Sequence, residues 1–238
     1  MTKNTTTKNL IKNQITECTS KNTITEEERI IKNLASRKHK QYSIIDGKTL
    51  VTFDERDLNE FGTYVTPENI TRIGPNAFAK CKKIKNLIIS NGVRYIGIGA
   101  FRDCLNLQTI SIPNSVETIK KTAFYNCQTL ESVILPKKIK AIEQYTFDNC
   151  RSLTSVTIPE KVTVIEDKAF KNCPNLTTIN GASNVTTIGN ETFACCVRLK
   201  TVPFGENLTS IQPKSFAMCP IQSSVSRLVS QNKKSVTL

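Results

Sequence analysis

The chain has no tryptophan and a single histidine among its 238 residues. That histidine, His39, lies in a polar segment that offers no acid–base partner for catalysis. The nucleophile motif G-x-S-x-G, the phosphate-binding P-loop and the dinucleotide motif G-x-G-x-x-G are all missing. We therefore expect no enzymatic activity, no cofactor and no small-molecule substrate.

Long apolar runs are also missing. No stretch approaches the roughly 18 residues of a transmembrane helix, and no apolar segment follows the first lysines as it would in a secretory signal. We expect no transmembrane segment. The location is then cytoplasmic, or membrane-associated or at the cell surface by a non-classical export route.

The chain does contain a repeat with a period of 23 residues, visible as three parallel series. The cysteines are Cys81, Cys104, Cys127, Cys150, Cys173, Cys196 and Cys219. The phenylalanines are Phe78, Phe101, Phe124, Phe147, Phe170, Phe193 and Phe216. The isoleucines are Ile73, Ile96, Ile119, Ile142, Ile165, Ile188 and Ile211. A constant period of this length over seven copies predicts a solenoid.

Each unit reads (V/I)-x-x-I-x-x-x-x-F-x-x-C-x-x-L-x-x-(V/I)-x-(I/L)-P. Alternation at its end, as in Thr109-Ile-Ser-Ile112, predicts one short strand per unit with one side buried. Proline then ends the strand, because it cannot donate a ladder hydrogen bond. The Phe-x-x-Cys segment is too short for a full helix, and we expect a tight or 3₁₀-like turn. Stacking buries each unit against its neighbours.

This pattern resembles the BspA-type leucine-rich repeat, over roughly residues 67–222. The resemblance implies an α/β, β-rich leucine-rich-repeat solenoid that binds a protein or another ligand. It also implies a cell-surface role in adhesion.

Cysteine use fits this interpretation. Seven of the nine cysteines hold one inward position, so we expect reduced thiols packed as small apolar groups rather than disulfides. We expect no metal site, because the spacing lacks C-x-x-C pairs. Cys195 lies one residue outside the series and is expected to point outward, where it could be a reactive thiol.

The domain organisation is predicted as follows: 1–24, a disordered polar tail; 25–66, an N-terminal cap; 67–222, the seven repeats; and 223–238, a C-terminal cap and tail. The N-terminal cap comprises a helix near 25–38, starting at the capping box Thr25 to Glu28, and a hairpin with an Asp46-Gly47 turn. Leu58, Phe61 and Tyr64 precede Cys81, Ile84 and Leu87 by 23 residues, which indicates a degenerate half-repeat.

The outward strand positions form a hydroxyl-rich, mostly uncharged surface, the candidate ligand-binding face. Its residues are Asn86, Ile88, Thr109, Ser111, Ser132, Ile134, Ser155, Thr157, Thr178 and Asn180. Serine and threonine also suit any exposed sheet, so this composition has a purely structural explanation as well. A second candidate surface, the basic rim, comprises Arg94, Lys120, Lys121, Lys137, Lys138 and Lys140.

A net charge of +13 is compatible with an anionic partner such as nucleic acid or an anionic membrane, but a solvated lysine-rich surface is the simpler explanation of the charge. The leading hypothesis is a binding or adhesion scaffold for a protein or surface ligand. The alternatives are an intracellular scaffold for an anionic partner, and an adaptor that docks through the 25–38 helix.

Overall fold

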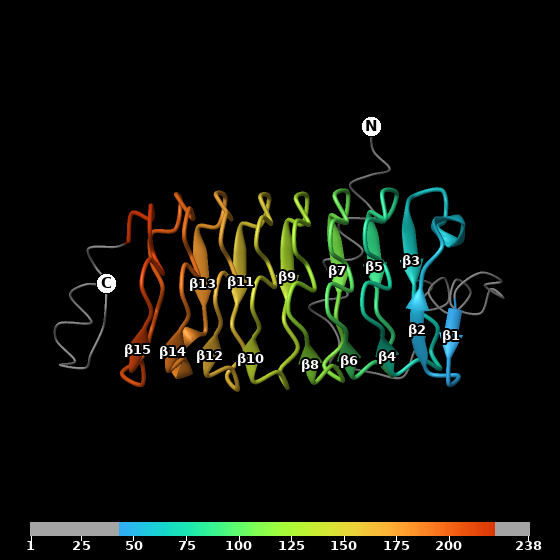
Figure 1. The fold of residues 1–238 in the computed structure, drawn as a ribbon, viewed down its shortest axis with the longest axis horizontal. Helices are drawn as coiled ribbons and strands as arrows, with labels where there is room; N and C mark the ends of the chain where they lie inside the picture. Colours follow the sequence, from blue (N-terminus) through green and yellow to red (C-terminus); the bar gives the residue numbers. More distant parts are fainter. Residues whose placement is uncertain (1–42, 222–238) are drawn as a thin grey trace, which may run out of the picture.

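Each 23-residue unit forms one coil of a solenoid, in the computed structural model that describes residues 43–221. The coils stack along the long axis of the molecule (Figure 1). Each coil passes through a three-residue strand, then a two-residue strand, and then a series of turns that carries the Phe and Cys positions. The β-rich leucine-rich-repeat solenoid predicted from the sequence is confirmed, and the described residues contain no α-helix.

The three-residue strands form what we call the long-strand row. Its members are β3 (Thr63–Val65), β5 (Asn86–Ile88), β7 (Thr109–Ser111), β9 (Ser132–Ile134), β11 (Ser155–Thr157) and β13 (Thr178–Asn180). Paired strands are parallel and in register with the repeat, so that Val156 lies opposite Ile179. From β5 to β13 the central residue is buried and its two neighbours are half-buried or exposed, as the alternation predicted, whereas all three residues of β3 are buried.

A second set of strands, the short-strand row, was not predicted. It comprises β4 (Arg72–Ile73), β6 (Tyr95–Ile96), β8 (Thr118–Ile119), β10 (Ala141–Ile142), β12 (Val164–Ile165), β14 (Thr187–Ile188) and β15 (Ser210–Ile211). Each strand has only two residues, too few for alternation to be visible in the sequence. The isoleucine series supplies the buried residue of every one.

The third side of each coil, the turn row, contains the Phe-x-x-Cys segment. Cys127 N donates to Phe124 O at 3.2 Å, which makes the predicted tight turn. Two residues have positive φ, Thr122 at 59° just before this turn and Asn126 at 59° within it, and the equivalent residues of the other coils repeat this conformation. Asparagine adopts the left-handed region more readily than most residues, which suits Asn126 to its place.

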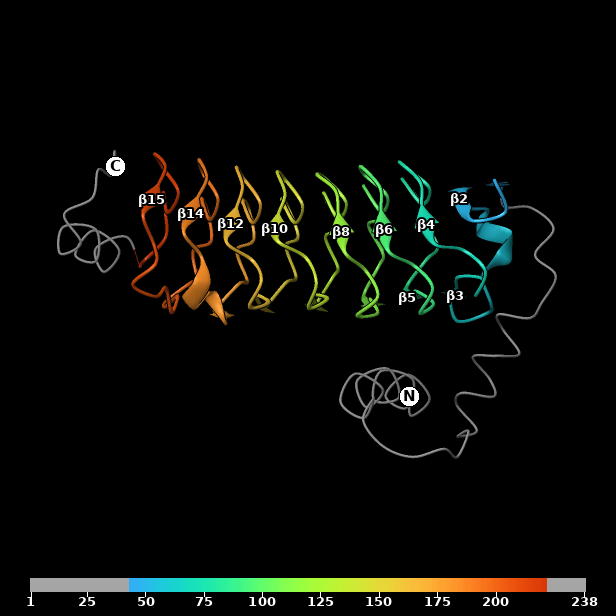
Figure 2. The ribbon, with the colours of Figure 1, turned by 90° about the horizontal axis from the view of Figure 1, so that it is seen from below.

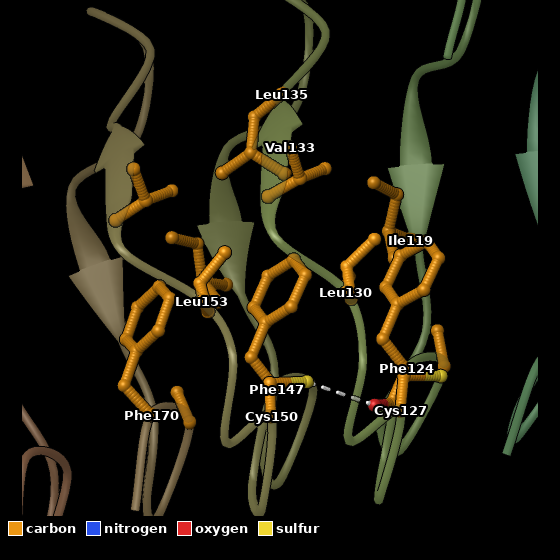
Figure 3. Packing of buried hydrophobic residues seen from close by; sticks show 14 of the residues in the cluster. Ile119, Phe124, Cys127, Leu130, Val133, Leu135, Phe147, Cys150, Leu153 and Phe170 are labelled. Carbon is orange, nitrogen blue, oxygen red and sulfur yellow. Dashed lines mark hydrogen bonds between the residues drawn. The ribbon is translucent and has the colours of Figure 1, made fainter. Parts of the chain in front are cut away.

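The core contains the three residue series in stacked rows (Figure 3). Consecutive phenylalanine rings from Phe78 to Phe216 lie 5.2–5.5 Å apart. From Cys104 onward, each cysteine of the 23-residue series donates its thiol hydrogen to the carbonyl of the phenylalanine 26 residues earlier, as Cys150 does to Phe124 O at 3.2 Å. Cysteine therefore fills a small apolar space and also bonds a buried backbone oxygen.

At the N-terminal end, β1 (Ser43–Ile45) and β2 (Thr49–Thr52) form the predicted hairpin. Its turn residues Asp46 and Gly47 both have positive φ, as a type I′ turn requires. β2 pairs with β4 in parallel, so the hairpin extends the short-strand row by two strands. The 3₁₀ helix η1 (Glu55–Asp57) then leads towards β3.

Two local expectations were wrong. Phe61 is 53% exposed instead of occupying a buried position like that of Ile84. The side chain of Asn59 accepts hydrogen bonds from the backbone N–H groups of Phe61 and Thr63, and this turn directs Phe61 outward. After β13 and the 3₁₀ helix η2 (Ala182–Asn184), residues 201–204 form only an isolated bridge at Thr201 instead of a strand, since a proline follows at 203.

Several predictions fall outside residues 43–221. They are the polar tail, the 25–38 helix, the C-terminal cap and tail at 223–238, and the position of His39. The boundaries at 24, 66 and 222 stay predictions.

Candidate functional site

The outward side of the long-strand row presents the ten candidate ligand-binding residues as two adjacent columns. The parallel register brings Ser132, Ser155 and Thr178 into one column and Ile134, Thr157 and Asn180 into the other. Parallel strands lie about 4.8 Å apart, so the columns form a regular, closely spaced array. The structure therefore brings the predicted residues together on one surface.

The N-terminal half of this surface is internally bonded. Asn86 Nδ2 donates to Thr63 Oγ1 at 3.2 Å, and Thr109 Oγ1 donates to Asn86 Oδ1 at 2.8 Å. These polar groups already have protein partners, and Asn86, Ile88, Thr109 and Ser111 are all half-buried. A ligand would gain little by replacing such bonds.

The C-terminal half is more open. Ser132, Ile134, Thr157 and Asn180 are exposed, and Ile134 reaches 50% exposure. Ile88, the other isoleucine of the candidate face, is half-buried and adds less apolar surface than Ile134. The apolar contact on this surface is therefore concentrated at Ile134.

The basic rim is divided and partly neutralised. Lys120 and Lys121 follow β8, whereas Lys137, Lys138 and Lys140 precede β10. The two groups of lysines therefore lie at opposite ends of the short strands, one after the strand and the other before it. Lys120 forms an ion pair with Glu143, and this hydrogen bond raises the pKa of the lysine.

A second ion pair joins Lys138 Nζ to Glu117 Oε1 at 3.2 Å. Arg94, Lys121, Lys137 and Lys140 are exposed. The pairing of these lysines with Glu117 and Glu143 was not predicted from the sequence. The interval of 23 residues between Lys120 and Glu143 was the available signal.

The thiols do not form a reactive site in the repeat. The seven cysteines of the series are free and buried. Burial raises the pKa of the Cys81 thiol to about 11, and the pKa of Cys127 is raised still further by complete burial. Cys195 is half-buried, and its Sγ lies 3.7 Å from the Sδ of the exposed Met218.

Within residues 43–221, no three His, Cys, Asp or Glu side chains gather as metal ligands would. The same part of the chain contains no helix with the length and apolar character to cross a bilayer.

Comparison with known families decides the relationship. The family model described as "BspA type Leucine rich repeat region" matches residues 52–139 and 117–228, in six copies. The chain belongs to this family. A search of the curated proteins gave no match.

Several solved structures show the same fold. A leucine-rich repeat protein of Bacteroides ovatus is 30% identical with a TM-score of 0.63, over 74% of this chain and 49% of its own. The T. pallidum leucine-rich repeat protein is 20% identical with a TM-score of 0.60, over 83% of this chain and 94% of its own. The pneumococcal vaccine antigen PcpA is 22% identical with a TM-score of 0.50, over 81% of this chain and 44% of its own. This chain therefore spans about half the length of two of these relatives.

Proposed function

We propose that this BspA-type chain is a non-enzymatic binding scaffold that engages a protein or neutral surface ligand, as an adhesion protein does. The binding residues are those on the outward side of the long-strand row, chiefly in its C-terminal half. The repeat-protein fold supports the general role, because stacked coils present extended surfaces suited to binding.

The observation that carries the proposal is the position of Ile134. It is a large apolar side chain, 50% exposed, in the middle of a surface of hydroxyl and amide groups. The neighbouring Ser132 is exposed, and no side-chain hydrogen bond to it occurs within the described residues. An apolar centre with polar groups around it is the general composition of a protein interface.

The test uses three variants of the full chain. Ile134→Glu places a charge at the centre of the face. Val197→Glu is the matched control, because Val197 is also 50% exposed but lies in the turn after Cys196. Lys137→Glu with Lys140→Glu reverses two exposed charges of the basic rim for which no ion pair occurs within residues 43–221. Circular dichroism checks that each variant folds.

The probes are immobilised extracellular-matrix proteins, neutral glycans and heparin. We expect binding to a protein or neutral glycan that falls at least about tenfold in Ile134→Glu and is unchanged in Val197→Glu, since a buried unpaired charge costs more than about 1.4 kcal/mol. Equal effects of the two variants, or no binding to any such probe, would refute the proposal.

The unpaired lysines favour a second candidate function, binding of an anionic partner. It predicts retention on heparin that falls steeply with salt and is lost in the double lysine variant. The adaptor alternative depends on the 25–38 segment, which lies outside the described residues.

A further inference from the structure

The junction between the third and fourth coils differs from every other junction in the described part of the solenoid. Both strand rows are interrupted there at once. The long-strand row divides into β3-β5-β7 and β9-β11-β13, and the short-strand row divides between β8 and β10. Because both sheets are interrupted at the same coil boundary, the interruption reflects how the two coils are stacked and is not caused by one irregular strand.

The interruption is clearest in the short-strand row. At a regular junction, Glu166 N donates to Ile142 O at 2.9 Å, and Gly97 N donates to Ile73 O at 2.8 Å. Among residues 43–221, no corresponding bond joins Glu143 N to Ile119 O. Figure 2 shows that the coils stand further apart at β8 and β10 than at the neighbouring junctions.

The turn row is continuous through the same junction. Phe124 N donates to Thr146 O at 2.9 Å, and Asn126 N donates to Asp148 O at 2.8 Å. The rings of Phe124 and Phe147 are stacked 5.2 Å apart at an angle of 2°. The thiol of the fourth coil still bonds the phenylalanine carbonyl of the third (Figure 3). The two halves of the solenoid are therefore joined along the turn row and by one further backbone bond just before the long strands, from Glu131 N to Gln108 O at 3.3 Å. The short-strand side is the open side of the junction.

Side chains cross the open side in place of the missing backbone bonds. The carboxylate of Glu143 pairs with Lys120 and also accepts a hydrogen bond from Lys121 N at 2.8 Å. On the other end of the short strands, Lys138 pairs with Glu117. Both pairs are partly exposed, so dissolved salt screens them.

We propose that this junction is a hinge. The turn row is its pivot, and the pairs Lys120–Glu143 and Lys138–Glu117 form a latch that holds the short-strand side closed. Opening the latch rotates the first three coils against the last four and bends the long-strand row beside Ile134. The hinge itself is independent of any ligand, whereas its effect on binding rests on the function proposed above.

Amide hydrogen exchange of the full chain, measured by mass spectrometry, tests the hinge without a ligand. Exchange reports local opening of backbone hydrogen bonds. We expect protection factors at residues 140–143 at least about tenfold lower than at the equivalent residues 163–166. Raising the salt from about 0.05 M to about 1 M should lower protection at 140–143 and leave 163–166 unchanged, because only the first segment depends on screened ion pairs.

Two variants complete the experiment. Glu117→Gln with Glu143→Gln removes both ion pairs of the latch. At low salt this variant should show the low protection at residues 140–143 that the unmodified chain shows at high salt, and added salt should not lower it further. Glu191→Gln is the matched control, because Glu191 pairs with Lys168 and Lys171 across a junction whose ladder is intact. Equal protection at the two segments in the unmodified chain, or a control that changes residues 140–143 as much as the latch variant does, would overturn the hinge.

Discussion

The turn row and the outward side of the long-strand row are parts of the same repeat, yet they differ in how strictly the sequence repeats. Phenylalanine and cysteine recur in all seven units of the turn row and are at most 6% exposed. The outward strand positions instead vary among Asn, Ile, Ser and Thr. A buried residue must fit the coils on both of its sides, whereas an outward residue mainly meets solvent. Specificity for a ligand can therefore reside in the outward residues without disturbing the stack.

The largest effect that this comparison predicts is on stability. Phe147→Ala should lower the free energy of unfolding by about 3–5 kcal/mol, because it leaves a cavity between two stacked rings. Ile134→Ala, on the outward side, should cost less than about 1 kcal/mol. Urea denaturation of both variants measures the difference. Similar losses would mean that the two sides contribute equally to stability.

The cysteine series predicts an intermediate effect that depends on pH. Burial raises the pKa of Cys81 from 9.0 to about 11, so the unfolded thiol ionises at a pH where the folded thiol remains protonated. The contribution of the buried thiols to the free energy of unfolding should be at its full value below about pH 9. It should fall as the pH rises towards 11, by at most about 1.4 kcal/mol per pH unit for each buried thiol. Urea denaturation of the unmodified chain at about pH 8, 9 and 10 measures how the free energy of unfolding depends on pH. These values extend about one unit to either side of the ordinary thiol pKa.

Variants identify the source of that slope. Between about pH 9 and 10, the free energy of unfolding of Cys127→Ala should fall by about 1 kcal/mol less than that of the unmodified chain, because Cys127 is fully buried. Cys195→Ala, outside the buried series, should leave it unchanged. If neither variant alters the slope, groups other than the buried thiols are responsible.

The smallest effect concerns the backbone of the turn row. Lys214 has a φ of 58° and is exposed, so its side chain contributes strain without compensating burial. Lys214→Gly should raise the free energy of unfolding by about 0.5–1 kcal/mol, because glycine adopts this conformation freely. Lys200→Gly, at an exposed residue without positive φ, should lower it by a similar amount. Thermal unfolding of both variants measures whether each substitution raises or lowers stability. If both variants are less stable than the unmodified chain, the backbone at Lys214 is not strained.

Much of the fold could be predicted because one signal recurs in seven units. The period, the alternation at residues such as 109–112 and the buried Phe-x-x-Cys turn all repeat, so irregularities in one unit do not hide the pattern. The Asp46-Gly47 turn was predictable from its dipeptide alone. Phe61 was assigned wrongly because the period was extended into a segment where Asn59 forms its own turn.

The candidate face was predictable only in part. Alternation indicates which strand residues point outward, and the structure brings those residues into columns. Alternation does not indicate how exposed they are, and Ile88 and Ile134 differ in this respect although both occupy the same column. The difference arises from neighbouring coils and loops, which no single unit of sequence describes.

The sequence by itself determined the repeat length, the buried residue series and the family, because a solenoid with identical coils requires the same apolar residue at each level. Only the tertiary structure decided the second strand row, the thiol-to-carbonyl bonds and the ion pairs at the junction between β8 and β10. These features depend on which atoms of one coil meet those of the next. Such contacts form only when the coils are stacked. A two-residue strand carries no local pattern, and the 23-residue interval from Lys120 to Glu143 becomes an ion pair only when their coils are neighbours.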